Sequence, residues 1–160
     1  MRLRVTWFGR TSASAYEEQI ETYRQRVSRR WPSEDCPLRP VSGGREKDPR
    51  RVLRLEAEAV ERQREAGWRL VALDERGRGL DSGGFARWLA GLEDRGVGGI
   101  LFVIGSDLGL DHTFLEQADE RISLSAMTLP HLLVRALLWE QLFRATSILG
   151  GGAYHRSCVQ

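Results

Sequence analysis

Hydrophobic and polar positions along the chain fall into short runs that alternate between a strand-like and a helix-like period. Strands are predicted where apolar residues occupy every second position or a continuous run that ends at glycine, proline or a polar residue. Five segments fit this description: Leu3–Phe8, Cys36–Val41, Trp68–Leu73, Ile100–Ile104 and Arg121–Leu124. Prolines flank the second segment, which predicts a strand at the edge of a sheet.

Apolar residues three and four positions apart predict helices between the strands, and several helices have start signals. Asp48-Pro49, Ser82 and Asp111 fit N-caps, and Ser14 with Glu17 fits a capping box. The predicted helices are Ala15–Arg30, Pro49–Ala66, Gly83–Arg95, Thr113–Asp119 and His131–Thr146. This alternation predicts an α/β fold, with a mostly parallel sheet flanked by helices on both faces, in a single domain over residues 1–160.

The last predicted helix is apolar over more than half of its circumference. Its apolar residues are Leu132, Val134, Ala136, Leu138, Trp139, Leu142, Phe143 and Ala145. A helix on the outside of a monomer needs a narrower stripe, so this pattern predicts burial on two sides, against the sheet and against a second subunit. The alternative is a helix packed deep inside one subunit.

Composition and charge narrow the class of protein. The chain has 160 residues and a net charge of +2. The two cysteines lack metal-ligand spacing, and neither a signal peptide nor a membrane-spanning run is present, which predicts a cytoplasmic protein with reduced thiols and no metal. The basic residues within 24–30 and 45–54, nearly all arginine, could hold an RNA backbone or be solvated helix faces.

Common nucleotide and hydrolase motifs are missing from the sequence. It has no P-loop, no G-x-G-x-x-G after the first strand and no G-x-S-x-G elbow. What remains is three strand ends: Leu73-Asp74-Glu75, Ile104-Gly105-Ser106 and Leu124–Leu129. Ligands of open α/β sheets bind at the carboxyl ends of strands, so we expect these loops to hold an adenine-type ligand, with Leu73, Met127 and Leu129 against its ring.

The carboxyl-terminal tail carries a second candidate. Three consecutive glycines, 150–152, precede Tyr154, His155 and Arg156. An aromatic ring, an imidazole and a guanidinium after a glycine hinge fit an arm that stacks on a base, handles a proton and holds a phosphate. The alternative from composition alone is a disordered terminus.

Three stretches taken together resemble a known family. They are Leu-Ser-Ala-Met-Thr-Leu-Pro-His at 124–131, Glu-Gln-Leu-Phe-Arg-Ala at 140–145 and Tyr-His-Arg at 154–156. They resemble the bacterial large-subunit rRNA methyltransferase H family of the SPOUT superfamily, and the likeness extends over nearly the whole chain. The resemblance implies a deep C-terminal trefoil knot, over about 98–160, and a homodimer, with S-adenosylmethionine bound in the knot. It also implies methylation of N3 of a pseudouridine in 23S rRNA, in the stem-loop that faces the decoding region of the assembled ribosome.

The resemblance also implies roles for individual residues. The expected cofactor contacts are Leu73, Gly105, Leu124, Ser125, Ala126, Met127, Thr128 and Leu129. The expected substrate-side residues are Tyr154, His155 and Arg156. For the mechanism we add the hypothesis that His155 is the base or an orienting group, and that Arg156 and Arg135 favour the anionic form of the uracil-type imide.

The chain departs from the family pattern at two places. Ser106-Asp107 replaces a second glycine, and Ala153 replaces a proline before the tail motif. A Cβ at Ser106 would come close to a bound ligand and weaken binding.

A function of another class remains open on the residues alone: a non-catalytic RNA-binding or ribosome-associated module. That module would bind RNA without regard to S-adenosylmethionine. A nicotinamide-dependent oxidoreductase is disfavoured because the dinucleotide fingerprint is missing.

Overall fold

Five parallel strands form one sheet in the computed structural model, which describes residues 1–9, 15–41, 47–152 and 154. The strands are β1 (Arg2–Phe8), β2 (Ser33–Leu38), β3 (Arg69–Gly79), β4 (Gly99–Ile104) and β5 (Glu120–Ser123). Their order across the sheet is β2-β1-β4-β3-β5, and every pair is parallel. The predicted parallel sheet and the edge position of its second strand are therefore confirmed.

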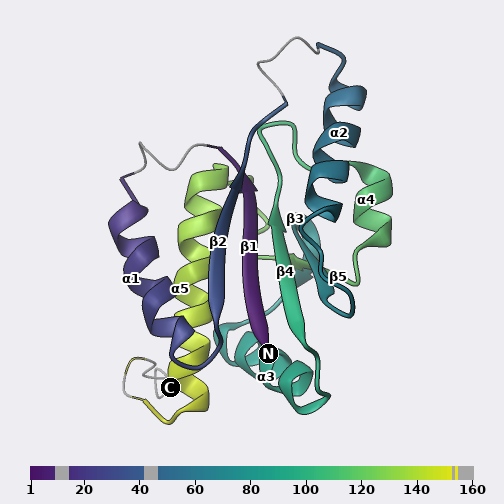
Figure 1. Cartoon of the computed structure of the whole chain (residues 1–160). Helices are drawn as coiled ribbons and strands as arrows, with labels where there is room; N and C mark the ends of the chain where they lie inside the picture. Colours follow the sequence, from purple (N-terminus) through teal and green to yellow (C-terminus); the bar gives the residue numbers. More distant parts are fainter. Residues whose placement is uncertain (10–14, 42–46, 153, 155–160) are drawn as a thin grey trace.

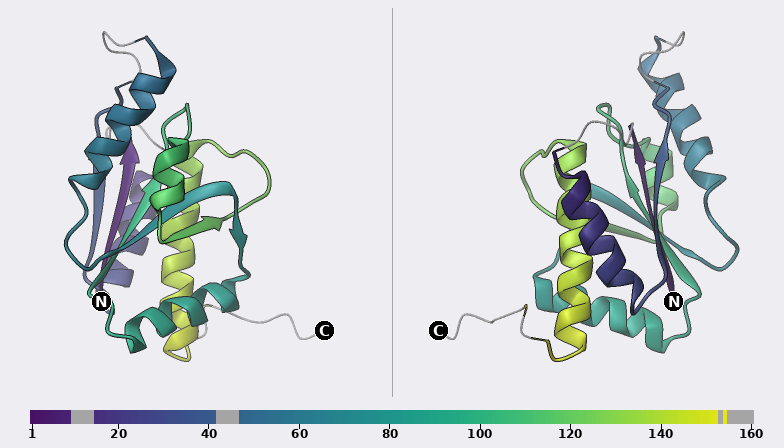
Figure 2. Two further views of the ribbon diagram at one scale, coloured as in Figure 1. Left: turned by 90° about the vertical axis from the view of Figure 1, so that its right-hand side faces the viewer. Right: turned by 60° about the vertical axis from the view of Figure 1, so that its left-hand side comes forward.

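Helices cover both faces of the sheet (Figures 1 and 2). On one face lie α1 (Glu17–Ser28), α3 (Ser82–Asp94) and α5 (His131–Leu149), and on the other lie α2 (Pro49–Glu61) and α4 (His112–Gln117). Strand β4, in the middle, is buried along its whole length. Burial on both faces explains why its sequence is a continuous apolar run rather than an alternating one.

Strand β3 differs most from the prediction, which ended this strand at Leu73 and placed a loop after Asp74. The strand continues to Gly79, and its register against β5 shifts between Leu73 and Arg78. Gly77 lies in the shifted segment, where a Cβ would come 2.7 Å from the backbone carbon of Ile122. Gly77 thus permits close packing of β3 against β5, where the sequence predicted a loop.

Three predicted helix boundaries also need correction. Helix α1 begins at Glu17 after an N-cap, Tyr16, that makes no side-chain capping bond, and Ser14 of the predicted capping box lies outside the described residues. Helix α2 ends at Glu61 rather than Ala66, although its N-cap Asp48 accepts from the Arg50 N–H as predicted. The side chain that caps α3 belongs to Asp81 and not to Ser82.

Helix α5 packs against α1, which runs alongside it, and against α3, which crosses it near its carboxyl-terminal end (Figure 2). Every residue from His131 to Leu149 is buried or half-buried within the one chain. The flanking helices thus account for much of its wide apolar surface, and the second subunit remains a prediction. The trefoil knot likewise remains a prediction implied by the family resemblance.

Two structural features of the described residues bear on the class of protein. No helix among them has the length and apolar character needed to cross a bilayer. No cluster of three or more histidine, cysteine, aspartate or glutamate residues placed to hold a metal ion occurs in that part of the chain.

Candidate functional site

A pocket of about 790 Å³ lies at the carboxyl ends of β4 and β5, against residues 73–76 in the middle of β3. This size falls within the range of about 300–1,000 Å³ typical of small-molecule sites. Seven of the eight predicted cofactor residues line it: Leu73, Gly105, Leu124, Ser125, Met127, Thr128 and Leu129. Ala126 belongs to the same loop but is not among the lining residues. The structure therefore brings together the three segments that the sequence singled out, although residues 73–75 lie within β3 and not at its end.

The loop after β4 closes on itself in a tight turn. The Gly109 N–H donates to the Ser106 carbonyl at 2.8 Å, and the Leu108 N–H donates to the Ser106 hydroxyl at 3.3 Å. Gly109 has φ +81°. A Cβ on Gly105 would come 2.5 Å from the Gly109 carbonyl oxygen, so this position requires glycine. Ser106, which departs from the family pattern, is buried and uses its hydroxyl to hold the turn.

The loop after β5 is shaped by hydroxyl groups. The Ser123 hydroxyl donates to the Ser125 carbonyl at 2.8 Å, and the Met127 N–H donates to the Ser125 hydroxyl at 2.9 Å. Met127 remains 74% exposed. These short local bonds fix the backbone while leaving an apolar side chain beside the pocket.

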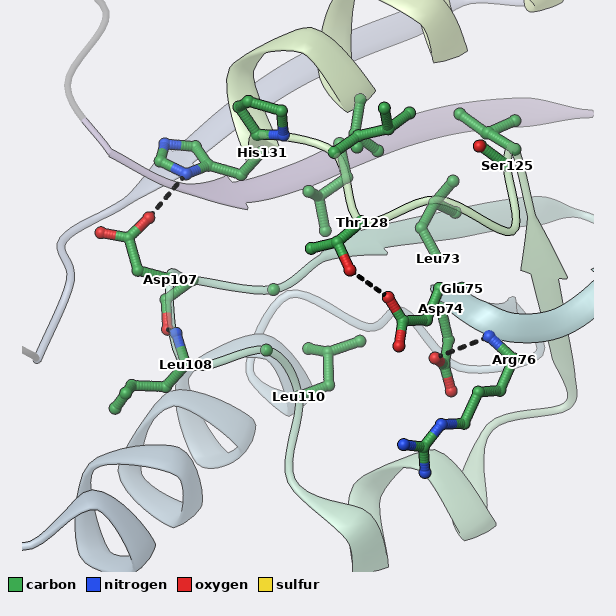
Figure 3. Close-up of a pocket in the computed structure, with 18 of the residues that line it drawn as sticks. Leu73, Asp74, Glu75, Arg76, Asp107, Leu108, Leu110, Ser125, Thr128 and His131 are labelled. Carbon is green, nitrogen blue, oxygen red and sulfur yellow. Dashed lines mark hydrogen bonds and ion pairs between the residues drawn. The ribbon is translucent and has the colours of Figure 1, made fainter.

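Two side-chain contacts join the walls of the pocket (Figure 3). The Thr128 hydroxyl donates to Glu75 at 2.7 Å, which links the loop after β5 to β3. His131 at the start of α5 pairs with Asp107 of the β4 loop at 3.0 Å. Sequence reasoning did not predict these pairs. The one indication in the sequence was that these four residues all come shortly after predicted strands.

The lining chemistry fits S-adenosylmethionine. Leucine and isoleucine side chains from all three strand ends offer apolar walls to an adenine ring. The carboxylates of Asp74, Glu75 and Asp107 outnumber the cationic candidates Arg76 and His131, which favours a ligand with a positive centre such as a sulfonium.

Arg135 does not lie where the hypothesis of a cation beside the imide requires it. Its side chain is 2% exposed, and its guanidinium donates to Glu17 at 2.5 and 2.9 Å and to Asp35 at 2.7–3.2 Å. Burial alone would lower the pKa of Arg135, but the hydrogen bonds and charges of Glu17 and Asp35 outweigh it and raise this pKa. We therefore correct the assignment: these two carboxylates hold Arg135 inside the protein, where it cannot contact a base.

Tyr154 is the one tail-motif residue within the described part of the chain. Its ring packs on Phe143 with centroids 4.6 Å apart, and its hydroxyl donates to Glu140 at 3.1 Å. Burial and the neighbouring Tyr23 and Glu140 raise the pKa of Tyr154, which keeps the phenol neutral. A neutral phenol suits stacking and hydrogen bonding rather than proton abstraction. His155 and Arg156 lie outside the described residues.

Comparisons with known proteins agree with this fold and site. Residues 1–155 match the family model described as "Predicted SPOUT methyltransferase". The solved structure of a probable methylase family protein from Haemophilus influenzae Rd KW20 has the same fold. It aligns with a TM-score of 0.54 over 97% of this chain and 70% of that chain, at 14% identity. The protein is thus a methyltransferase of the SPOUT class, which uses S-adenosylmethionine as methyl donor.

Closer relatives identify the family within this class. The ribosomal RNA large subunit methyltransferase H of Geobacter sp. (strain M21) is 37% identical over 155 residues, which cover 97% of this chain and 99% of the relative. The protein of the same name from Allorhizobium ampelinum is 36% identical over 160 residues, covering 98% and 100%. The chain belongs to the ribosomal RNA large subunit methyltransferase H family, as its resemblance predicted.

Proposed function

We propose that this protein methylates N3 of a pseudouridine in 23S rRNA, with S-adenosylmethionine bound in the pocket between residues 73–76 of β3 and the loops that follow β4 and β5. The observation that carries the proposal is the meeting of Leu73, Gly105 and the 124–129 loop around one cavity. The names of the relatives support an RNA substrate. We further propose a cytoplasmic protein of a single domain, which acts on rRNA within the assembled ribosome.

The reaction requires the protein mainly to align the methyl donor with the N3 atom of the target base. When bound, S-adenosylmethionine supplies an electrophilic methyl group. The loops of the pocket hold the donor in one orientation, which is a proximity effect. The N3 proton of the target must also leave, because the deprotonated nitrogen is the better nucleophile. His155 is the candidate base, and Arg156 is the cation that would favour the imide anion.

We propose that the working site is shared between two subunits of a homodimer. In this chain Tyr154 packs beside Phe143 of α5. Phe143 lies twelve residues after His131, which lines the pocket. At about 1.5 Å per helical residue, that separation is roughly 18 Å along the axis. A tail that begins so far from its own pocket suits a partner's pocket better. Leu133 and Leu137, one turn apart and half-buried on α5, offer apolar surface for a partner.

A mixed dimer tests the shared site. One subunit lacks residues 153–160, and the other carries Gly105→Ala in the pocket. At a cofactor concentration too low to fill the Gly105→Ala pocket, each homodimer is expected to show little activity, whereas the mixture regains part of it, because one composite site keeps an intact pocket and an intact tail. Methyl transfer to ribosomes is the measurement. Absence of any rescue, with mixed dimers verified by two affinity tags, would show that the site lies within one chain.

The reaction itself is tested by mass spectrometry of rRNA nucleosides. Ribosomes from cells that lack this gene are incubated with the purified protein and S-adenosylmethionine. We expect one methyl group per large subunit, in a product nucleoside identified as N3-methylpseudouridine. The non-catalytic RNA-binding module would leave the rRNA unmethylated while binding it equally with and without the cofactor.

A further inference from the structure

A second hollow, of about 670 Å³, lies between α2 and α4. Four arginines of the α2 region line it: Arg50, Arg51, Arg54 and Arg62. All four are exposed, and within the described residues Arg50, Arg54 and Arg62 form no ion pair. Other arginines pair with carboxylates: Arg64 pairs with Asp119, and Arg144 pairs with Glu140. The guanidinium groups of Arg50, Arg54 and Arg62 are therefore available to an anion.

The acidic residues of the hollow are arranged unevenly. Asp48 and Asp111 cap the two helices, where each accepts from a backbone N–H at 3.1 Å. Glu58 and Glu61 lie in the second half of α2, so the first half presents Arg50, Arg51 and Arg54. The positive end of the helix dipole lies at the same end. Charge thus favours an anionic ligand toward the N-terminal end of α2.

The hollow and the pocket are neighbours. Leu115 of α4 lines the pocket, whereas Thr113, Phe114 and Gln117 of the same helix line the hollow. One helix therefore separates the two, a thickness of about 10–12 Å. At roughly 3.4 Å per stacked nucleotide, this is about three nucleotides. Figure 1 shows α2 rising beyond the carboxyl ends of the strands. The pocket is lined by the loops at the carboxyl ends of β4 and β5.

We propose that this hollow, lined by Arg50, Arg51, Arg54 and Arg62, binds the phosphate backbone of the substrate RNA a few nucleotides from the base that is methylated. Arginine suits the task because its planar fork holds phosphate oxygens with two donors. Ala57 and Phe114 add apolar surface to the hollow, against which a ribose or a base edge can pack next to the arginines. The inference rests on the proposed RNA substrate and adds a second binding surface that sets affinity and register rather than chemistry.

The double variant Arg50→Gln with Arg54→Gln tests this surface. We expect its KM for ribosomes purified from cells lacking this gene to rise about tenfold, with kcat and the affinity for S-adenosylhomocysteine unchanged. The slope of log affinity against log salt, measured by filter binding of the same ribosomal RNA, should become shallower by about 0.7–0.9 for each phosphate that the variant no longer neutralises. Arg87→Gln is the matched control, because Arg87 is exposed on α3 at the other end of the molecule.

The outcomes separate the two proposals. If wild type transfers no methyl group to ribosomes, the proposed reaction fails, and filter binding still decides whether the hollow holds RNA. If wild type is active and the double variant matches Arg87→Gln in KM and salt slope, the hollow does not bind the substrate. A change in cofactor affinity together with KM would also contradict the proposal, since it would show damage to the pocket instead.

Discussion

Replacement of Arg135 by methionine is expected to lower the free energy of unfolding by about 3–5 kcal/mol, as for other broken buried ion pairs. For a chain of this size, that corresponds to a fall in Tm of roughly 6–20 °C. The change leaves Asp35, 9% exposed, and Glu17, 31% exposed, without their shared cation. Denaturant titration at one fixed protein concentration is the measurement.

The reason lies in the number of elements that meet at Asp35. Its carboxylate accepts from Arg135, from the Trp7 indole at 3.1 Å and from the Trp139 indole at 2.8 Å. The Arg135 guanidinium also lies 4.1 Å from the Trp7 ring centroid. These contacts join β1, β2, α1 and α5, and the first turn of α5 lines the pocket. We infer that Arg135 positions the pocket wall through the helix that carries it.

Arg30→Met supplies the control for this prediction. The Arg30–Glu93 pair is 38% and 31% exposed, and such pairs contribute at most about 1 kcal/mol. A similar small loss for both variants would show that the buried cluster around Arg135 adds no more stability than a surface pair.

Substitution of alanine for Gly105 is expected to weaken binding of S-adenosylhomocysteine roughly 5- to 150-fold. The new Cβ would come 2.5 Å from the Gly109 carbonyl oxygen, so the β4 loop must shift. Overpacking of this kind typically costs about 1–3 kcal/mol, which gives the expected range in affinity when the strain falls on the binding loop. Calorimetric titration of the variant against wild type is the measurement.

Gly98→Ala is the control for the Gly105 variant. A Cβ on Gly98 meets nothing within 4 Å. The affinity of this control variant should equal that of wild type. Equal affinity of Gly105→Ala and wild type would show that the β4 loop does not form part of the cofactor site.

The strands and their burial could be predicted because they depend on local pattern. The apolar runs at Ile100–Ile104 and Trp68–Leu73 indicated buried strands, and strands β4 and β3 occupy these positions. The continuation of β3 through Gly77 to Gly79 could not be predicted. Its reason is the close approach to the backbone of β5, which lies more than 40 residues away in the sequence.

For the site, too, some features could be predicted from the sequence and others could not. Strand ends and small residues indicated the pocket, since the carboxyl edge of a parallel sheet follows from the order of elements. The pairs Asp107–His131 and Glu75–Thr128 depend on which loops face each other in three dimensions. The burial of Arg135 was missed for the same reason, because its partners Glu17 and Asp35 lie about 100 residues away. The family resemblance supplied the ligand, and the structure corrected the role that the mechanistic hypothesis gave to Arg135.

Calorimetric titration of the wild-type protein with S-adenosylhomocysteine tests the central claim most directly, namely that the pocket between residues 73–76 of β3 and the loops after β4 and β5 is the cofactor site. We predict saturable heat, a raised Tm in the presence of the ligand, and a loss of affinity in Gly105→Ala but not in Gly98→Ala. No heat and no thermal shift at millimolar ligand would contradict the account.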